Sequence, residues 1–137
     1  MDARSYLEQV QKIDKMIENK MIEKEQWETI ATGTAGQAAG ERVQTSVNRS
    51  KMSDAVIKAI GIEKDIERLT KKRRQIMDVI ESLDMEEYDL IHKVYVQGLS
   101  LWEAAELYGK SYQRVTAIHR SSLKNVQRLI YGSKKDE

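Results

Sequence analysis

No proline occurs anywhere in the 137 residues of the chain. Every residue therefore keeps its backbone N–H group, and nothing in the sequence interrupts a long helix. Residues that favour helices, such as Ala, Glu, Lys, Leu, Ile and Met, are abundant, whereas aromatic residues make up only 6% of the chain, which argues against a large globular core. We therefore expect an all-α protein in which each long helix buries one apolar stripe.

Two long helices are expected in the first 83 residues, because apolar residues recur at three- and four-residue steps over residues 2–30 and from about Ser53 to Leu83. The first stripe consists of Leu7, Val10, Ile13, Ile17, Met21, Trp27 and Ile30, and the second of Val56, Ile60, Ile62, Ile66, Leu69, Ile76, Ile80 and Leu83. Two helices of similar length with one stripe each most simply pair as an antiparallel hairpin or coiled coil, within the chain or across a homodimer.

Residues 31–51 differ in character from both helices. They hold three of the seven glycines (Gly33, Gly36 and Gly40) among small polar residues, which predicts a flexible linker with room for a short helix at about residues 38–47. The basic run at residues 71–74 of the second helix is expected to be a solvated face. Residues 1–83 thus form the expected first domain, and residues 84–137 the second.

The second domain opens with a helix start signal. Asp84 can cap a helix, Glu87 stands at the capping-box position, and Gly98 can end that helix. The side chains expected to face inward are Tyr88, Ile91, Val94 and Tyr95.

Two more helices follow with very little chain between them. Ser100 and Glu103 form a second capping box, Gly109 can end the helix, and Ser111 can start a third one that continues to about Tyr131. Consecutive helices joined so closely must cross steeply, as in a helix-turn-helix.

Four positions in these two helices fit that motif for steric reasons. Ala105 is small where the helices approach each other, Gly109 tolerates positive φ in the turn, and Val115 and Ile118 point back to close the core. An ordinary three-helix corner is the alternative explanation of this spacing.

Charge favours nucleic acid as the partner of the third helix. From residue 110 to residue 128 there is no acidic residue, and the basic ones are Lys110, Arg114, Arg120, Lys124 and Arg128. A helix with an apolar face and a purely basic opposite face is typical of phosphate contact. A basic helix that binds a protein partner is the competing interpretation.

If the third helix enters the major groove of DNA, its first turns reach base edges. The side chains expected there are Tyr112, Gln113, Thr116, Ala117 and Arg120. Gln113 could bind adenine, Arg120 guanine, and Thr116 or Ala117 a thymine methyl group. The expected phosphate contacts are Lys110, Ser111, Arg114 and Lys124. His119 is expected to be packed rather than catalytic, and Trp102 to pack against other helices of the domain.

Other function classes lack their signatures. The chain has no cysteine, and its two histidines cannot build a zinc site without several converging carboxylates. The glycines of residues 33–40 lack the Lys-Ser/Thr pair of a phosphate-binding loop. No apolar run is long enough for a membrane span. We therefore expect a cytoplasmic protein without enzymatic activity, metal or cofactor.

The stretch GLSLWEAAELYGKSYQRVTAIHRSSLKNVQRL (residues 98–129), preceded by VYVQ, resembles region four of sigma-70-type factors. With the upstream segment MSDAVIKAI, nearly the full length is similar to small phage-encoded proteins that have such a C-terminal domain and are often grouped with activators of late transcription. The chain has no counterpart of sigma region two. The resemblance implies a phage or prophage transcription regulator that binds double-stranded DNA, with host RNA polymerase as a further candidate partner.

Two alternatives belong to other classes. A small terminase subunit of a DNA-packaging machine also joins a helix-turn-helix to helical assembly elements, and it would form a ring of many subunits. A helical protein–protein adaptor would bind no nucleic acid, and the basic residues of the third helix speak against it.

Overall fold

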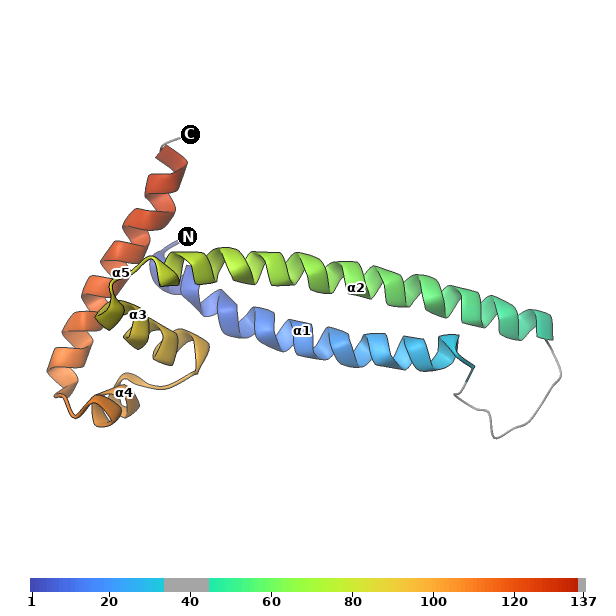
Figure 1. Ribbon diagram of the computed structural model, residues 1–137, viewed down its shortest axis with the longest axis horizontal. Coiled ribbons are helices and arrows are strands. Elements are labelled where there is room, and N and C mark those ends of the chain that lie inside the picture. Colours follow the sequence, from blue (N-terminus) through green and yellow to red (C-terminus); the bar gives the residue numbers. More distant parts are fainter. Residues whose placement is uncertain (34–44, 136–137) are drawn as a thin grey trace. The chain divides into compact units, whose positions relative to one another are not determined.

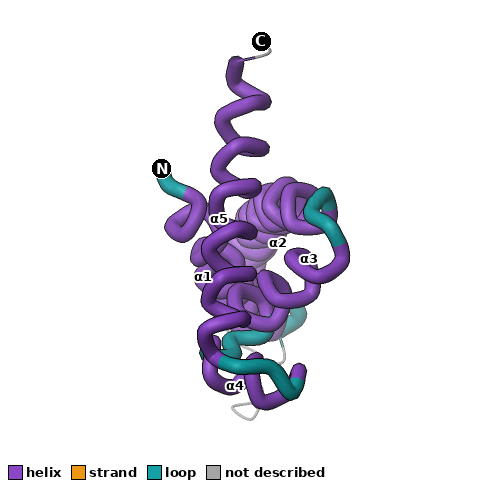
Figure 2. The backbone as a smooth tube through the Cα atoms, turned by 90° about the vertical axis from the view of Figure 1, so that its left-hand side faces the viewer, coloured by secondary structure: helices purple, strands orange, loops and turns teal. Residues whose placement is uncertain are grey.

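The computed structural model describes residues 1–33 and 45–135. Its elements in chain order are α1 (Ala3–Ala31), α2 (Thr45–Glu81), α3 (Met85–Ile91), the π-helix η2 (His92–Val96), α4 (Leu101–Tyr108) and α5 (Tyr112–Lys135) (Figure 1). The described ranges contain helices, turns and loops and no strand (Figure 2), so the expected all-α class is confirmed. None of these helices is both long and apolar enough to span a membrane.

The second long helix begins earlier than expected. It starts at Thr45 rather than at Ser53, so that residues 45–51 of the expected linker are helical. After Gly40 no glycine occurs until Gly61, and nothing in the backbone opposes a helix over this stretch. Ala31 of the expected linker is the last residue of α1, and residues 34–44, with most of the short helix expected at residues 38–47, lie outside the described residues.

The chain divides into two compact units. One, here called the head unit, combines Met1–Ile13 with Lys72–Glu137, and the other, the hairpin unit, consists of Asp14–Lys71. Both α1 and α2 contribute residues to both units. The division into domains at residue 83 stays a prediction.

The hairpin unit is an antiparallel pair of helices. Lys20 Nζ lies 3.4 Å from Asp65 Oδ2, and Lys58 Nζ lies 5.2 Å from the centroid of the Trp27 ring. A residue later in α1 therefore lies beside a residue earlier in α2, as in an antiparallel pair.

The buried seam of α2 differs in part from the predicted stripe. Val56 and Ile60 are 43% and 48% exposed, whereas Ala55 and Ala59 are buried. The predicted Met21 on α1 is exposed as well. Residues 55, 59, 62, 66 and 69 follow one another at alternating steps of four and three, which is the repeat of a coiled-coil seam. The prediction was wrong at residues 56 and 60 because it favoured large apolar side chains over the alanines that keep this repeat.

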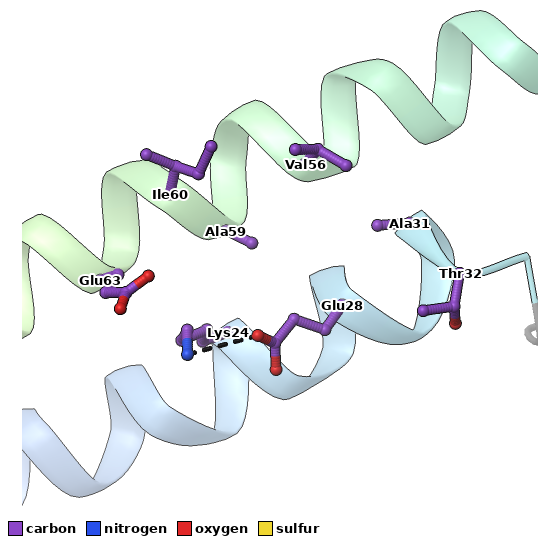
Figure 3. Close-up of a pocket in the computed structure, with 8 residues that line it drawn as sticks. All are labelled: Lys24, Glu28, Ala31, Thr32, Val56, Ala59, Ile60 and Glu63. Atoms are coloured by element: carbon purple, nitrogen blue, oxygen red, sulfur yellow. Dashed lines mark ion pairs between the residues drawn. The ribbon is translucent and has the colours of Figure 1, made fainter.

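Small residues at the seam also leave space beside it. A groove of about 460 Å³ is lined in part by Ala31 and Ala59, with Glu63 at its edge. Lys24 and Glu28 form an ion pair of 3.3 Å on its α1 side (Figure 3). Alanine side chains are too short to fill the distance between the two helices here, which accounts for the groove.

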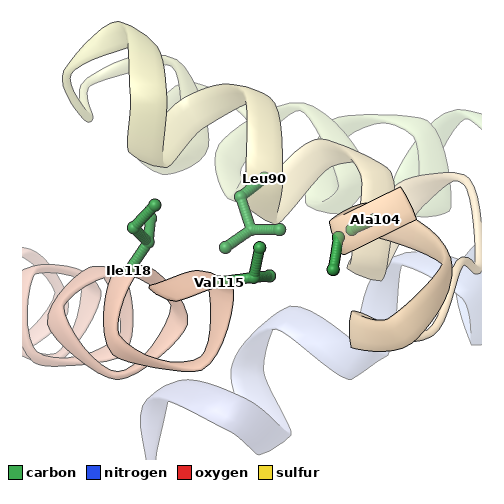
Figure 4. Packing of buried hydrophobic residues seen from close by; sticks show 5 residues of the cluster. Leu90, Ala104, Val115 and Ile118 are labelled. Carbon is green, nitrogen blue, oxygen red and sulfur yellow. The ribbon is translucent and has the colours of Figure 1, made fainter. Parts of the chain in front are cut away.

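The head unit has a core of its own. Its buried cluster consists of Leu90, Ala104, Ala105, Val115 and Ile118 (Figure 4), with Val94, Leu101 and Tyr108 packed against it. The cluster joins α3 and α4 to α5. The first turns of α1 belong to the same unit, and there Leu7 and Val10 are fully buried.

Candidate nucleic-acid interface

The helix pair α4–α5 is built from local signals. Ser100 Oγ accepts from the Glu103 N–H at 3.1 Å, and the Ser100 N–H donates to Glu103 Oε1 at 2.9 Å. At the other junction Ser111 Oγ accepts from the Arg114 N–H at 3.1 Å. The predicted capping box and the predicted start of α5 are therefore confirmed.

Gly109 forms the turn between α4 and α5. Its φ is 64°, in the left-handed region. Its N–H donates to the carbonyl of Glu106, and the N–H of Lys110 donates to the carbonyl of Ala105. These two bonds are those of a Schellman motif, which ends a helix and needs a residue tolerant of positive φ. The predicted role of Gly109 is confirmed.

The other three positions of the predicted pattern meet in the core. Ala105, Val115 and Ile118 are all buried in the cluster that joins α4 to α5. A helix that ends at a left-handed glycine and packs on the next helix through these side chains is the arrangement expected of a helix-turn-helix.

Helix α3 is fixed to α5 by the buried carboxylate of Glu87. Asp84 caps α3 as predicted, accepting from the Glu87 N–H at 3.0 Å. The Glu87 side chain does not complete the predicted capping box. It is buried, and its oxygens accept from Ser121 Oγ at 2.9 Å and from Asn125 Nδ2 at 2.8 Å. Hydrogen bonds to α5 thus replace the local bond to the backbone.

His119 faces the interior from α5, as expected. Its Nε2 lies 2.8 Å from the Tyr95 hydroxyl, and the two rings are stacked with 5.7 Å between their centroids. Burial, and secondarily the charge of Arg4, lowers the pKa of His119 below its ordinary value of 6.5. Above pH 6.5 the imidazole is therefore a packed, neutral group, and its contact with Tyr95 connects α5 to η2.

The opposite side of α5 faces solvent. Gln113, Ala117, Arg120 and Lys124 are exposed, and their steps of four, three and four place them on one face of the helix. Three residues predicted at base edges thus share a surface with one predicted at phosphates. We call these four residues the α5 stripe.

Two further residues predicted on that surface are half-buried. Tyr112 stacks on the ring of Trp102, with 4.1 Å between the centroids. Thr116 is turned inward, and its hydroxyl is buried without a hydrogen-bond partner in the described part of the chain. Both side chains are therefore less open to solvent than the α5 stripe, and residues 112 and 116 lie on the side of α5 adjacent to it.

Trp102 also differs from its prediction. It was expected to pack among the helices of the head, but it is 65% exposed and contacts Tyr112 across the junction of α4 and α5. The pair brings the first turns of the two helices together.

The cations at the start of α5 have an acidic neighbour that the sequence interpretation missed. Lys110 Nζ lies 3.1 Å from Glu86 Oε2, and Arg114 Nη2 lies 3.7 Å from the same oxygen. Lys110 Nζ also lies 5.6 Å from the centroid of the Tyr108 ring. Glu86 belongs to the first turn of α3, where an acidic residue is ordinarily explained by the helix dipole. Nothing local reveals its partners.

Tyr108 is held in place by a second set of polar contacts. Its hydroxyl donates to Asp89 Oδ2 at 2.5 Å, and Lys93 Nζ lies 3.0 Å from Asp89 Oδ1. The hydrogen bond from Tyr108, followed by that from Lys93, lowers the pKa of Asp89. Burial, followed by the bond to Asp89, raises the pKa of Tyr108. Tyr108 therefore stays protonated, and its bond to Asp89 holds the ring that Lys110 Nζ contacts.

Comparison with known proteins gives a similarity to a named bacterial protein. Neither a protein-family model nor a solved structure matches the chain. Over 99 residues the chain is 26% identical to the RNA polymerase sigma factor SigO of Bacillus subtilis (strain 168). The match covers 72% of this chain and 53% of that protein, so the chain spans about half the length of this relative. At this coarse level, the chain is similar to a bacterial sigma factor.

Proposed function

We propose that the chain is a sequence-specific DNA-binding transcription regulator of phage or prophage type, with no catalytic role, and that α5 enters the major groove. The observation that supports this most directly is the α5 stripe. Polar and basic side chains share the exposed face of a helix whose other face is fixed in the core through Val115 and Ile118. A rigid helix with this surface suits recognition of DNA.

Within the stripe the proposed roles follow position and chemistry. Gln113 and Arg120 would bind base edges, as adenine and guanine ligands respectively. Thr116 is half-buried, so contact with a thymine methyl group would fall to Ala117. Lys124, further along the helix, would contact phosphate.

Phosphate contacts are also proposed at the start of α5. Lys110, Ser111 and Arg114 are exposed there, and Tyr112 lies beside them with its ring held by Trp102. Such contacts position a protein on the duplex without selecting a sequence.

Similarity to a protein named as an RNA polymerase sigma factor supports transcription as the process and host RNA polymerase as a candidate partner. The regulator would then act in the cytoplasm of a bacterial host cell. We further propose a homodimer through the long helices, since Met21 and Ile22 of α1 and Val56, Ile57 and Ile60 of α2 are exposed apolar residues of the hairpin unit.

The proposal is tested by separating base contacts from phosphate contacts. Gln113→Ala and Arg120→Ala should each weaken binding to the preferred duplex by about 1–3 kcal/mol and weaken binding to random DNA much less. Lys124→Ala should weaken all duplexes alike and reduce the slope of log affinity against log salt by about one. Binding isotherms at two salt concentrations on both duplexes measure these changes.

Lys72→Ala is the matched control, because Lys72 is an exposed cation on α2 rather than on α5. It should leave affinity for the preferred duplex nearly unchanged. If Gln113→Ala and Arg120→Ala leave site preference unchanged, α5 does not bind base edges. If the wild-type protein binds no duplex at any salt concentration, the proposed function is wrong.

A further inference from the structure

Two cations of the head unit converge on one oxygen atom. Glu86 Oε2 lies 3.1 Å from Lys110 Nζ and 3.7 Å from Arg114 Nη2. Glu86 belongs to the first turn of α3, Lys110 to the turn after α4, and Arg114 to the first turns of α5. Three separate elements of the head unit thus supply one anion and two cations at a single point.

All three side chains are open to solvent, with exposed fractions of 48% for Glu86, 39% for Lys110 and 59% for Arg114. Ion pairs this exposed contribute little to folding, because water and salt screen the charges. Stability alone therefore gives little physical reason for the arrangement.

The two cations are held in position by more than their attraction to Glu86. Lys110 lies over the ring of Tyr108, whose hydroxyl is bound to Asp89. The backbone of Arg114 is fixed by its hydrogen bond to the Ser111 cap. If Glu86 moved away, the Lys110 ammonium would still have the Tyr108 ring beside it, and the Arg114 backbone would keep its place in the first turn of α5. A phosphate oxygen binds the same donors as a carboxylate oxygen does.

We propose that Lys110 and Arg114 form one binding site for a single phosphate of the DNA backbone, and that the Glu86 carboxylate occupies this site in the free protein. The phosphate displaces Glu86 when the duplex binds. This inference rests on the proposed function and extends it, since Glu86 becomes an internal competitor that weakens the sequence-independent part of DNA binding.

The test is the variant Glu86→Gln in the whole 137-residue chain, because it removes the negative charge of residue 86 and keeps its size. It should bind both the preferred duplex and a random one about three- to ten-fold more tightly at low salt, because two partly screened ion pairs no longer compete with the phosphate. The gain should shrink as salt is raised. Fluorescence anisotropy with labelled duplexes measures both effects.

Glu106→Gln is the matched control. Glu106 is an exposed carboxylate of α4, so the variant changes the net charge of the head unit equally. It should tighten binding by less than about two-fold, which corresponds to the general effect of one remote charge. A second comparison introduces each glutamine into a protein that already carries Lys110→Met and Arg114→Met. In that protein Glu86→Gln should tighten DNA binding no more than Glu106→Gln does.

The possible outcomes separate this inference from the proposed function. If the wild type binds DNA and Glu86→Gln behaves like Glu106→Gln, Glu86 is not a competitor and the inference is wrong. It is also wrong if Glu86→Gln binds more weakly, since Glu86 would then orient the two cations rather than compete for them. If the wild type binds no duplex, the proposed function and the inference are overturned together.

Discussion

Glu87 is a buried carboxylate that connects two helices of the head unit. Its oxygens accept hydrogen bonds from Ser121 and Asn125 of α5. Glu87→Ala should lower the free energy of unfolding by about 1–3 kcal/mol, because the Asn125 amide loses its acceptor in a partly buried site. Urea denaturation followed by circular dichroism measures the change. Glu106→Ala, at an exposed site of α4, should change stability by less than about 0.5 kcal/mol, and equal effects of both variants would contradict this role of Glu87.

Ala105 occupies the contact between α4 and α5, where it is buried in the core cluster. Ala105→Glu should unfold the head unit, because burying a carboxylate without a partner costs several kcal/mol. Ala117→Glu makes the same change on the exposed face of α5 and should leave the protein folded. Thermal melts of the two variants distinguish a buried contact from a general effect of negative charge on this domain. Near-normal stability of Ala105→Glu would contradict the burial of Ala105 between α4 and α5.

The buried His119 makes stability depend on pH in a defined direction. Its pKa in the folded state lies below its ordinary value of 6.5, chiefly because of burial. Between these two values the unfolded chain binds more protons than the folded one. The contribution of His119 to the free energy of unfolding is therefore fully present above pH 6.5, and it is lost as the pH falls through the folded-state pKa of His119.

Urea denaturation at pH 7.5, 6.5 and 5.5 tests this prediction. Wild-type stability should decrease between the last two values, and His119→Leu should show a smaller decrease over the same interval. Asp89 does not interfere, because its lowered pKa affects stability only below its ordinary value of 3.8. A wild-type profile that is flat from pH 7.5 to 5.5 would contradict the prediction.

Two glycines in different helical settings should respond to substitution with opposite sign. Gly109 ends α4 with φ at 64°, whereas Gly61 lies inside α2 with open space around the position of a Cβ atom. Gly109→Val should destabilise the protein by more than about 1 kcal/mol, since a branched residue is strained there. Gly61→Ala should stabilise it by about 0.5–1 kcal/mol. Thermal denaturation of both variants measures the signs, and a stabilising Gly109→Val would contradict the assigned turn.

Elements whose signals act within a few residues could be predicted from the sequence. The caps Asp84, Ser100 and Ser111 and the terminating Gly109 each form bonds to groups no more than four residues away. Their residue types are therefore sufficient to place the start or end of a helix. The inward positions of Val115 and Ile118 follow from their spacing after Gly109 along the same helix pair.

Features that depend on distant parts of the chain could not be predicted in this way. The seam of α2 passes through Ala55 and Ala59 rather than the larger Val56 and Ile60, and side-chain size alone does not indicate which positions face the partner helix. Glu86 meets Lys110 across 24 positions of sequence, which no local pattern encodes. The burial of Thr116 similarly depends on how α5 is rotated against its neighbours.

At the scale of the whole molecule, the proposed homodimer can be tested through the exposed apolar residues of the hairpin unit. Ile57 is 65% exposed and Ile60 48%. If these side chains are buried between subunits, Ile57→Glu combined with Ile60→Glu should convert the dimer to a monomer, because unpaired carboxylates at an apolar interface are costly. Sedimentation velocity measures the change.

The single variant Thr70→Glu, at an exposed polar site of the same helix, is the control and should leave the dimer intact. A wild-type chain that is monomeric at high concentration would contradict the proposed dimer. A ring of many subunits would instead support the DNA-packaging alternative over a transcription regulator.

The head unit is assembled from two segments that the hairpin unit separates in the sequence, and this has a consequence for folding during synthesis. Leu7 and Val10 leave the ribosome before residues 72–137, which form most of the unit in which these two side chains are buried. The hairpin unit lies between these segments and can fold earlier, since its two helices are closer in sequence. Until residues 72–137 have been synthesised, the apolar side chains of residues 1–13 have no complete partner surface, and exposed apolar side chains of this kind favour chaperone binding or premature aggregation.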